Sequence, residues 1–187
     1  MSTNSREAIL AAARLAGQAH GYNGLNFRDL ATEVGIKAAS LYHHFPSKAD
    51  LGVAVARRYW EDAGAALDAM YAELEDPVEC LRRYPGTFRV ALETGNRMCM
   101  CSFMASEYDD LPPNVQTEVQ VFADVNVAWL SKMLVLAGLV DEAGAERRAF
   151  AIFSGIAGAQ LSARGRADIS LYDAIVDDYR SIGLLPG

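Results

Sequence analysis

Hydrophobic positions recur at helical spacing over almost the whole chain. Between Ser5 and His20, apolar residues return every three or four positions, and Gly21 then ends the pattern. The same spacing predicts further helices over residues 27–34, 38–45, 48–73, 78–94, 113–137, 142–164 and 171–182, with a short segment near 102–108. No alternation typical of a strand is evident in the sequence. The predicted fold class is therefore all-α.

The predicted helices form a short N-terminal group followed by longer, more apolar helices. Pro46 ends the third helix because proline cannot continue it, and Ser47 is expected to cap the next one. This pattern predicts two domains, a helix-turn-helix domain at 1–47 and a helical domain at 48–187. The long helix 48–73 is expected to be the only element that links them.

The helices at 27–34 and 38–45 are joined by a tight turn at Gly35. Glycine suits such a turn because it adopts a left-handed backbone at little cost. Two short helices with this connection are typical of a helix-turn-helix, whose second helix enters the major groove of DNA. The alternative is a helical hairpin that packs locally inside an all-helical protein.

The second of these helices is narrow at its start and polar along one face. Ala38 and Ala39 keep it thin enough for a groove about 12 Å wide. Lys37 and Ser40 can reach phosphates or base edges near the helix start, where the helix dipole favours anions. Leu41 and Phe45 lie four residues apart and are expected in the core. These features favour DNA binding over local packing.

Composition and charge change this interpretation only in part. The 187-residue chain is 51% hydrophobic, enough for a substantial core, and its net charge of −7 argues against nucleic acid. However, residues 1–50 carry five Lys and Arg against four Asp and Glu, whereas residues 51–187 carry twelve against twenty. The acidic excess therefore lies outside the predicted DNA-binding segment. A dimer that binds two half-sites would compensate for the modest charge.

Several protein classes lack support in the sequence. There is no uninterrupted run of 18 apolar residues and no signal-type hydrophobic segment near the N-terminus, so no membrane association is expected. Three unevenly spaced cysteines fit a reducing cytoplasm. The chain has no phosphate loop, GxSxG or HExxH motif, so we predict neither an enzyme nor a cofactor. Cys99-x-Cys101 with only three histidines is a poor ligand set, so no metal site is predicted.

Residues 5–60 resemble the DNA-binding domain of the TetR family of transcriptional regulators. The resemblance is carried by GYNGLNFRDLA and VGIKAASLYHHFPSKADL. It implies a homodimer that associates through C-terminal helices, binds a palindromic operator in double-stranded DNA as a repressor, and responds to a small-molecule inducer of unknown identity. It also implies that the DNA contacts are made by Asn26, Arg28, Lys37, Ala38, Ser40, Tyr42 and His43, with Lys48 on a phosphate.

A sulfur-rich segment, RMCMCSFM at 97–104, is the most unusual feature of the C-terminal part. Cys99 and Cys101 can be packed as small hydrophobic residues, or one can act as a reactive thiolate. The stretch CMCSFMASEYDDL is similar to a GCLxxxxSAExxDL region in a cysteine-containing, electrophile-responsive, NemR-like branch of the family. That similarity places the sensing cysteine at Cys99 and the glutamate at Glu107, with Met98 in place of the glycine.

The alternative sensor is a cavity between the long helices that binds an apolar or aromatic molecule. The candidate lining residues share aromatic or amide side chains on the predicted helices, although each can equally belong to the core: Trp60, Phe88, Phe103, Tyr108, Trp129, Phe153 and Gln160. A DNA-binding structural protein without a sensor and a small helical enzyme are the remaining alternatives. The large, apolar, non-repetitive C-terminal part argues against the former.

Overall fold

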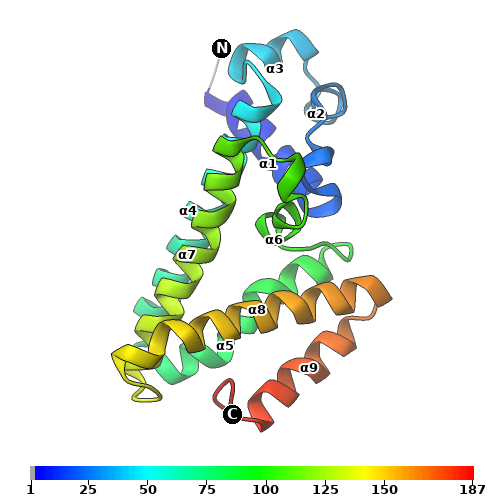
Figure 1. The fold of residues 1–187 in the computed structure, drawn as a ribbon. Helices are drawn as coiled ribbons and strands as arrows, with labels where there is room; N and C mark the ends of the chain where they lie inside the picture. The colour runs from blue at the N-terminus through cyan, green and yellow to red at the C-terminus, as the bar shows by residue number, and fades with distance from the viewer. Residues whose placement is uncertain (1–2) are drawn as a thin grey trace. The chain divides into compact units, whose positions relative to one another are not determined.

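The computed structural model describes residues 3–187, and within this range the chain forms helices and no strand (Figure 1). The all-α prediction is confirmed. The α-helices are α1 Thr3–His20, α2 Phe27–Val34, α3 Ala38–His44, α4 Lys48–Leu74, α5 Pro77–Glu93, α6 Met100–Ala105, α7 Pro113–Leu136, α8 Glu142–Arg166 and α9 Ile169–Ser181, with short 3₁₀ helices η1 Gly21–Gly24 and η2 Tyr108–Asp110.

Side-chain caps decide where several helices begin. The Asp76 carboxylate accepts hydrogen bonds from the backbone N–H groups of Val78 and Glu79, so α5 begins at Pro77, one residue earlier than predicted. Asp168 caps α9 in the same way, which places its start two residues before the predicted one. The short helix α6 begins at Met100 rather than near residue 102.

The chain divides into two compact units, and each consists of two separate segments. Unit 1 comprises Met1–Glu61 and Met100–Phe122, and unit 2 comprises Asp62–Cys99 and Ala123–Gly187. The chain passes between the units within α4, after Cys99 and within α7. The predicted domains 1–47 and 48–187 stay predictions, and residues 1–2 lie outside the described range.

In unit 1, α6 packs against α1 and η1. The side chains of Met100 and Met104 are fully buried there. Gly17 on α1 makes room for them, because a Cβ at this position would lie 2.8 Å from the Cγ and Sδ atoms of Met100. The segment that follows Cys99 in the sequence thus completes the core around the first helix.

A buried carboxylate joins α4 to α7 within unit 1. Glu118 is only 7% exposed, and it accepts hydrogen bonds from the indole N–H of Trp60 (2.9 Å) and from Nε of Arg57 (3.2 Å). The hydrogen bond from Arg57 is the main cause that lowers the pKa of Glu118, against the opposing effect of burial. The ionised carboxylate is therefore favoured in the folded chain.

Unit 2 is built from the second half of α4, α5, the second half of α7, α8 and α9. Tyr172 on α9 is buried, and its hydroxyl donates a hydrogen bond to the carbonyl oxygen of Pro85 on α5 (2.7 Å). Arg89 makes two hydrogen bonds to the carboxylate of Asp173 (2.7 and 2.9 Å). These contacts fix α5 against α9, and α8 packs against both.

Helix α7 passes a simple test for a membrane-spanning helix, with a mean hydropathy of 1.4 over 18 residues. Polar residues interrupt this helix, so it contains no uninterrupted apolar run of 18 residues. One such helix is weak evidence for a span, since a core helix passes the same test, and 44% of that window is buried inside the structure. The buried Asn126 on α7 accepts a hydrogen bond from the hydroxyl of Tyr84 (2.9 Å), which fits a core helix.

Candidate nucleic-acid interface

The start of α2 is fixed by its own N-cap. The side-chain oxygen of Asn26 accepts hydrogen bonds from the backbone N–H groups of Arg28 (2.9 Å) and Asp29 (3.3 Å). The helix ends at Gly35, which has a left-handed backbone (φ 73°) and turns the chain toward α3. The sequence places Asn26 directly before this helix as its expected cap, and the structure confirms that role in addition to the predicted DNA contact.

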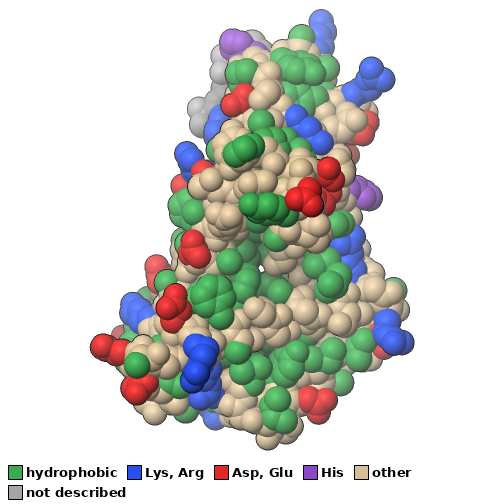
Figure 2. Space-filling model, in the orientation of Figure 1, with side chains coloured by type: hydrophobic (Ala, Val, Ile, Leu, Met, Phe, Trp, Pro, Cys, Tyr) green, Lys and Arg blue, Asp and Glu red, His purple; other side chains and the backbone are tan. Residues whose placement is uncertain are grey.

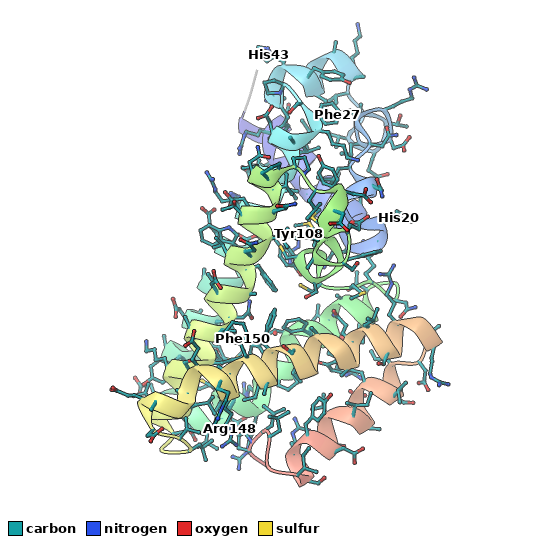
Figure 3. All side chains as sticks on the ribbon, in the orientation of Figure 1. His20, Phe27, His43, Tyr108, Arg148 and Phe150 are labelled. Carbon is teal, nitrogen blue, oxygen red and sulfur yellow. The ribbon has the colours of Figure 1, made fainter. Side chains whose placement is uncertain are left out.

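Helix α3 presents its predicted polar face to solvent. Leu41 and Phe45 are buried, as the spacing predicts, and they anchor the opposite face of the helix in unit 1. Tyr42 is 56% exposed, and its ring contacts Phe27 of α2 at a centroid distance of 4.7 Å. His43 is also exposed and lies on the outer side of α3 (Figure 3). One face of α3 is thus fixed in the core of unit 1, and the other face carries accessible hydrogen-bonding groups.

A polar cleft of about 670 Å³ lies at the start of α2, between α2 and α3. Five of the predicted DNA contacts line it, namely Asn26, Arg28, Ala38, Tyr42 and Lys48. The cationic side chains of Arg28 and Lys48 at this cleft suit a phosphate group. The cleft also contains the Asp29 carboxylate, which offsets part of the positive charge.

Lys48, at the start of α4, is half-buried in this cleft. Its ammonium group lies over the Tyr22 ring, with Nζ 4.3 Å from the ring centroid. Burial lowers the pKa of Lys48, and the negative charge of Glu107 acts in the opposite direction. The ring and the carboxylate thus restrict where the ammonium group can lie.

Three of the predicted DNA contacts lie outside the cleft. Lys37 and His43 are exposed and Ser40 is half-buried on α3, and none of the three is among the residues that line the cleft. The sequence interpretation missed Asn23, which does line it. Its only signal was a polar residue within the GYNGL segment, three positions before the N-cap of α2.

Comparisons with known proteins agree with this geometry. Residues 9–55 match the family described as "Bacterial regulatory proteins, tetR family". A stretch of 84 residues is 37% identical to the HTH-type transcriptional repressor AcnR of Corynebacterium glutamicum, over 40% of this chain and 43% of AcnR. The chain thus matches less than half the length of that relative. The crystal structure of a TetR transcriptional regulator from Legionella pneumophila is similar over 97% of both chains, with 29% identity and a TM-score of 0.89.

Residues 9–55 therefore form a TetR-family N-terminal domain. The matched proteins are named as transcription regulators, in keeping with the prediction that the chain is not an enzyme. The reduced form of Escherichia coli NemR is also similar, over 95% of this chain and 96% of NemR, with a TM-score of 0.81. Its sequence identity is only 19%, so this likeness shows the fold alone. The position of Cys99 in an electrophile-responsive branch stays a prediction.

The three cysteines are buried and form no disulfide. Cys99 is 3% exposed, and its backbone N–H donates a hydrogen bond to the side-chain oxygen of Gln160 (2.9 Å). Cys101 is 1% exposed on α6. A thiolate sensor needs access to its reactant, so this burial favours the packing alternative.

We expect the three thiols to react slowly in the folded protein. Burial is the largest cause that raises the pKa of Cys80, which lowers its thiolate fraction further. Colour release from Ellman's reagent should be slower than in urea-unfolded protein by a factor on the order of 10 or more. Cys99→Ser is the matched variant. If the folded wild type has one fast-reacting thiol that is absent from folded Cys99→Ser, Cys99 is accessible and the sensor hypothesis gains support.

Four of the predicted sensing residues belong to one aromatic cluster in unit 2: Phe88, Trp129, Phe153 and Gln160. In unit 2, Phe88 contacts Phe153 (6.2 Å between centroids), and Tyr84 contacts both Phe88 (5.9 Å) and Trp129 (6.0 Å). Gln160 joins this cluster, because its side-chain amide donates to the carbonyl oxygen of Phe88 (2.6 Å). Tyr84 was missed by the sequence interpretation, although it lies four residues before Phe88 on the same helix.

The other predicted sensing residues, Trp60, Phe103 and Tyr108, belong to unit 1. Trp60 bonds to Glu118, and Tyr108 is 53% exposed on η2. Their roles in sensing stay predictions.

Proposed function

We propose that this protein is a cytoplasmic, ligand-responsive transcriptional repressor of the TetR family that binds a palindromic DNA operator as a homodimer. The observation that carries the proposal is the cleft at the start of α2. Residues separated by up to 25 positions in the sequence, from Asn23 to Lys48, meet there beside the exposed face of α3. This is the arrangement that a helix-turn-helix needs to bind a phosphate and place side chains in the adjacent major groove.

The exposed apolar residues of α8 support the homodimer. Phe150 and Leu161 are 43% and 58% exposed, and Gly158 between them has open space where a side chain would lie. Figure 2 shows hydrophobic side chains over α8 and α9 with few charged groups between them. Contiguous apolar surface next to small residues suits close packing against the same helices of a second copy.

The aromatic cluster of unit 2 supports a small-molecule inducer. Trp129 is buried, and its indole N–H has no hydrogen-bond acceptor among the described residues. A buried donor without a partner is costly, so a bound molecule that offers an acceptor would relieve this cost. We infer that the inducer is an aromatic or apolar compound that carries a hydrogen-bond acceptor.

The test of DNA binding begins with selection of duplexes from a random pool, followed by a mobility shift with the promoter next to the protein's own gene. We expect a palindromic site bound by two copies. Tyr42→Ala should weaken binding about tenfold, because a base-edge contact is worth about 1–3 kcal/mol. Lys37→Ala should reduce the slope of log K against log salt by about 1.

Two variants serve as matched controls for these measurements. Tyr108→Ala removes an equally exposed tyrosine that does not line the cleft, and Lys132→Ala removes an exposed lysine of unit 2. Neither should change DNA affinity. If no duplex is enriched above the starting pool, the proposed function is wrong. If Tyr108→Ala weakens binding as much as Tyr42→Ala, α3 is not the recognition helix.

A further inference from the structure

Glu107 connects two parts of unit 1 that are far apart in the sequence. It lies in the link between α6 and η2, and one carboxylate oxygen, Oε2, accepts a hydrogen bond from the backbone N–H of Tyr22 (2.6 Å). The other oxygen, Oε1, accepts from the side-chain amide of Asn23 (3.2 Å). Bonds to an ionised acceptor are stronger than neutral ones. The carboxylate thus holds the connection between α1 and α2 by two separate bonds.

The glycine before Tyr22 is required for this contact. Gly21 has a left-handed backbone (φ +61°), and a Cβ there would lie 2.1 Å from Oε2 and 2.6 Å from Cδ of Glu107. Any other residue would displace the carboxylate in addition to straining the backbone. The GYNGL segment and Glu107, which both belong to the family resemblance, are therefore two sides of one contact.

Glu107 also acts on Lys48 through Tyr22. The Tyr22 ring lies under the Lys48 ammonium group, and it packs so close to α4 that a Cβ at Gly52 would be 2.9 Å from its Cε2 atom. The position of this ring depends on the Tyr22 backbone, which Glu107 holds. Asn23 and Lys48 both line the cleft at the start of α2. The Glu107 carboxylate thereby fixes Asn23 and Lys48, which line the cleft where a DNA phosphate is expected to bind.

We propose that Glu107 is a positioning residue for DNA binding, which holds Asn23 directly and Lys48 through Tyr22. The inference rests on the proposed function. It makes DNA affinity depend on where the segment Met100–Phe122 lies relative to α1 and α4, because Glu107 belongs to that segment. A displacement of α6 withdraws the carboxylate and releases the cleft-lining side chains without any change in the recognition helix itself.

The test compares Glu107→Ala, Glu107→Gln and Gly21→Ala with wild type on the selected duplex. Glu107→Ala should raise the Kd about tenfold, since bonds to a charged group are lost, and Gly21→Ala should act similarly by displacing the carboxylate. The Kd of Glu107→Gln should lie between those of Glu107→Ala and wild type, because the amide oxygen still accepts one hydrogen bond. Asp109→Asn, an exposed carboxylate two residues away, should leave the Kd unchanged.

Two readouts separate positioning from general destabilisation. Titration at high DNA concentration gives the active fraction, which a merely unfolded population would lower while the Kd of the remainder stays constant. The amide proton of Tyr22 in ¹H–¹⁵N spectra of DNA-free protein should be shifted downfield by its short bond and move upfield in Glu107→Ala.

Each outcome is decisive. If the Tyr22 resonance moves while the Kd of Glu107→Ala equals that of wild type, the contact exists but does not position the cleft, and the proposal is wrong. An unchanged Tyr22 resonance would show that the contact is absent in solution and would overturn it as well. Failure of the wild type to bind any duplex would instead refute the proposed function, and the positioning role with it.

Discussion

Residues 1–61 expressed alone will not fold as they do in the whole chain. In the structure their core is completed by apolar side chains from the second segment of unit 1, all of them buried: Met100, Met104, Leu111, Val115, Val119 and Phe122. Burial of each such side chain contributes about 1.5–3 kcal/mol, so the six together contribute on the order of 10 kcal/mol. This equals the typical stability of an entire domain, about 5–15 kcal/mol.

Far-UV circular dichroism tests this expectation directly. The full chain should melt in a cooperative transition, whereas the 1–61 fragment should show low helicity and no transition. A 1–47 fragment provides the direct test of the predicted domain boundary and should behave in the same way. If either fragment melts cooperatively, the N-terminal helices form an independent domain and the second segment of unit 1 is dispensable for their folding.

Replacement of Glu118 by alanine should lower the free energy of unfolding by about 2 kcal/mol. The variant loses the bonds from Trp60 and Arg57 and removes a buried carboxylate from the α4–α7 contact. The Arg57 side chain is 54% exposed, so its ion pair is screened by solvent and contributes little to this loss. Most of the effect should come from the half-buried indole N–H of Trp60, which is left without its acceptor.

The stabilisation by Glu118 should also depend on pH. The pKa of Glu118 is lower in the folded chain than in the unfolded chain, mainly because Arg57 bonds to its ionised form. Its contribution is therefore fully present above the unfolded-state pKa, about 4.3, and is lost as pH falls through the folded-state pKa. The free energies of unfolding of wild type and Glu118→Gln, measured with urea, should thus converge as pH decreases. The exposed Glu73→Gln serves as the control, and an equal pH trend in that variant would contradict the assignment to Glu118.

Local sequence signals predicted the helix-turn-helix with accuracy. Asn26, Gly35 and Pro46 act on their immediate neighbours, so the bounds of α2 follow from the sequence and those of α3 differ by one residue. The starts of α5 and α9 were predicted late because the caps formed by Asp76 and Asp168 were not recognised. Capping is local and could have been predicted from these aspartates.

The features that the sequence did not predict depend on long-range packing. No local pattern indicates that α6 lies on α1, and Gly17, a small residue within a helix, was the only hint. The contact of Glu107 with Tyr22 spans 85 positions and has no periodic signature. The aromatic candidates could not be separated for the same reason, since helical spacing identifies the inward face of a helix but not the unit it joins.

The discontinuous composition of unit 1 has a consequence for protein engineering. Chimeras that exchange operator specificity between family members are commonly imagined as a swap of one terminal segment. Here any donor segment with a side chain larger than glycine at position 17 or 21 would clash with Met100 or Glu107 of the recipient. A transplant of 1–61 together with 100–122 keeps both glycines with their native neighbours, and it moves the three chain junctions to α4, to the Cys99–Met100 bond and to α7.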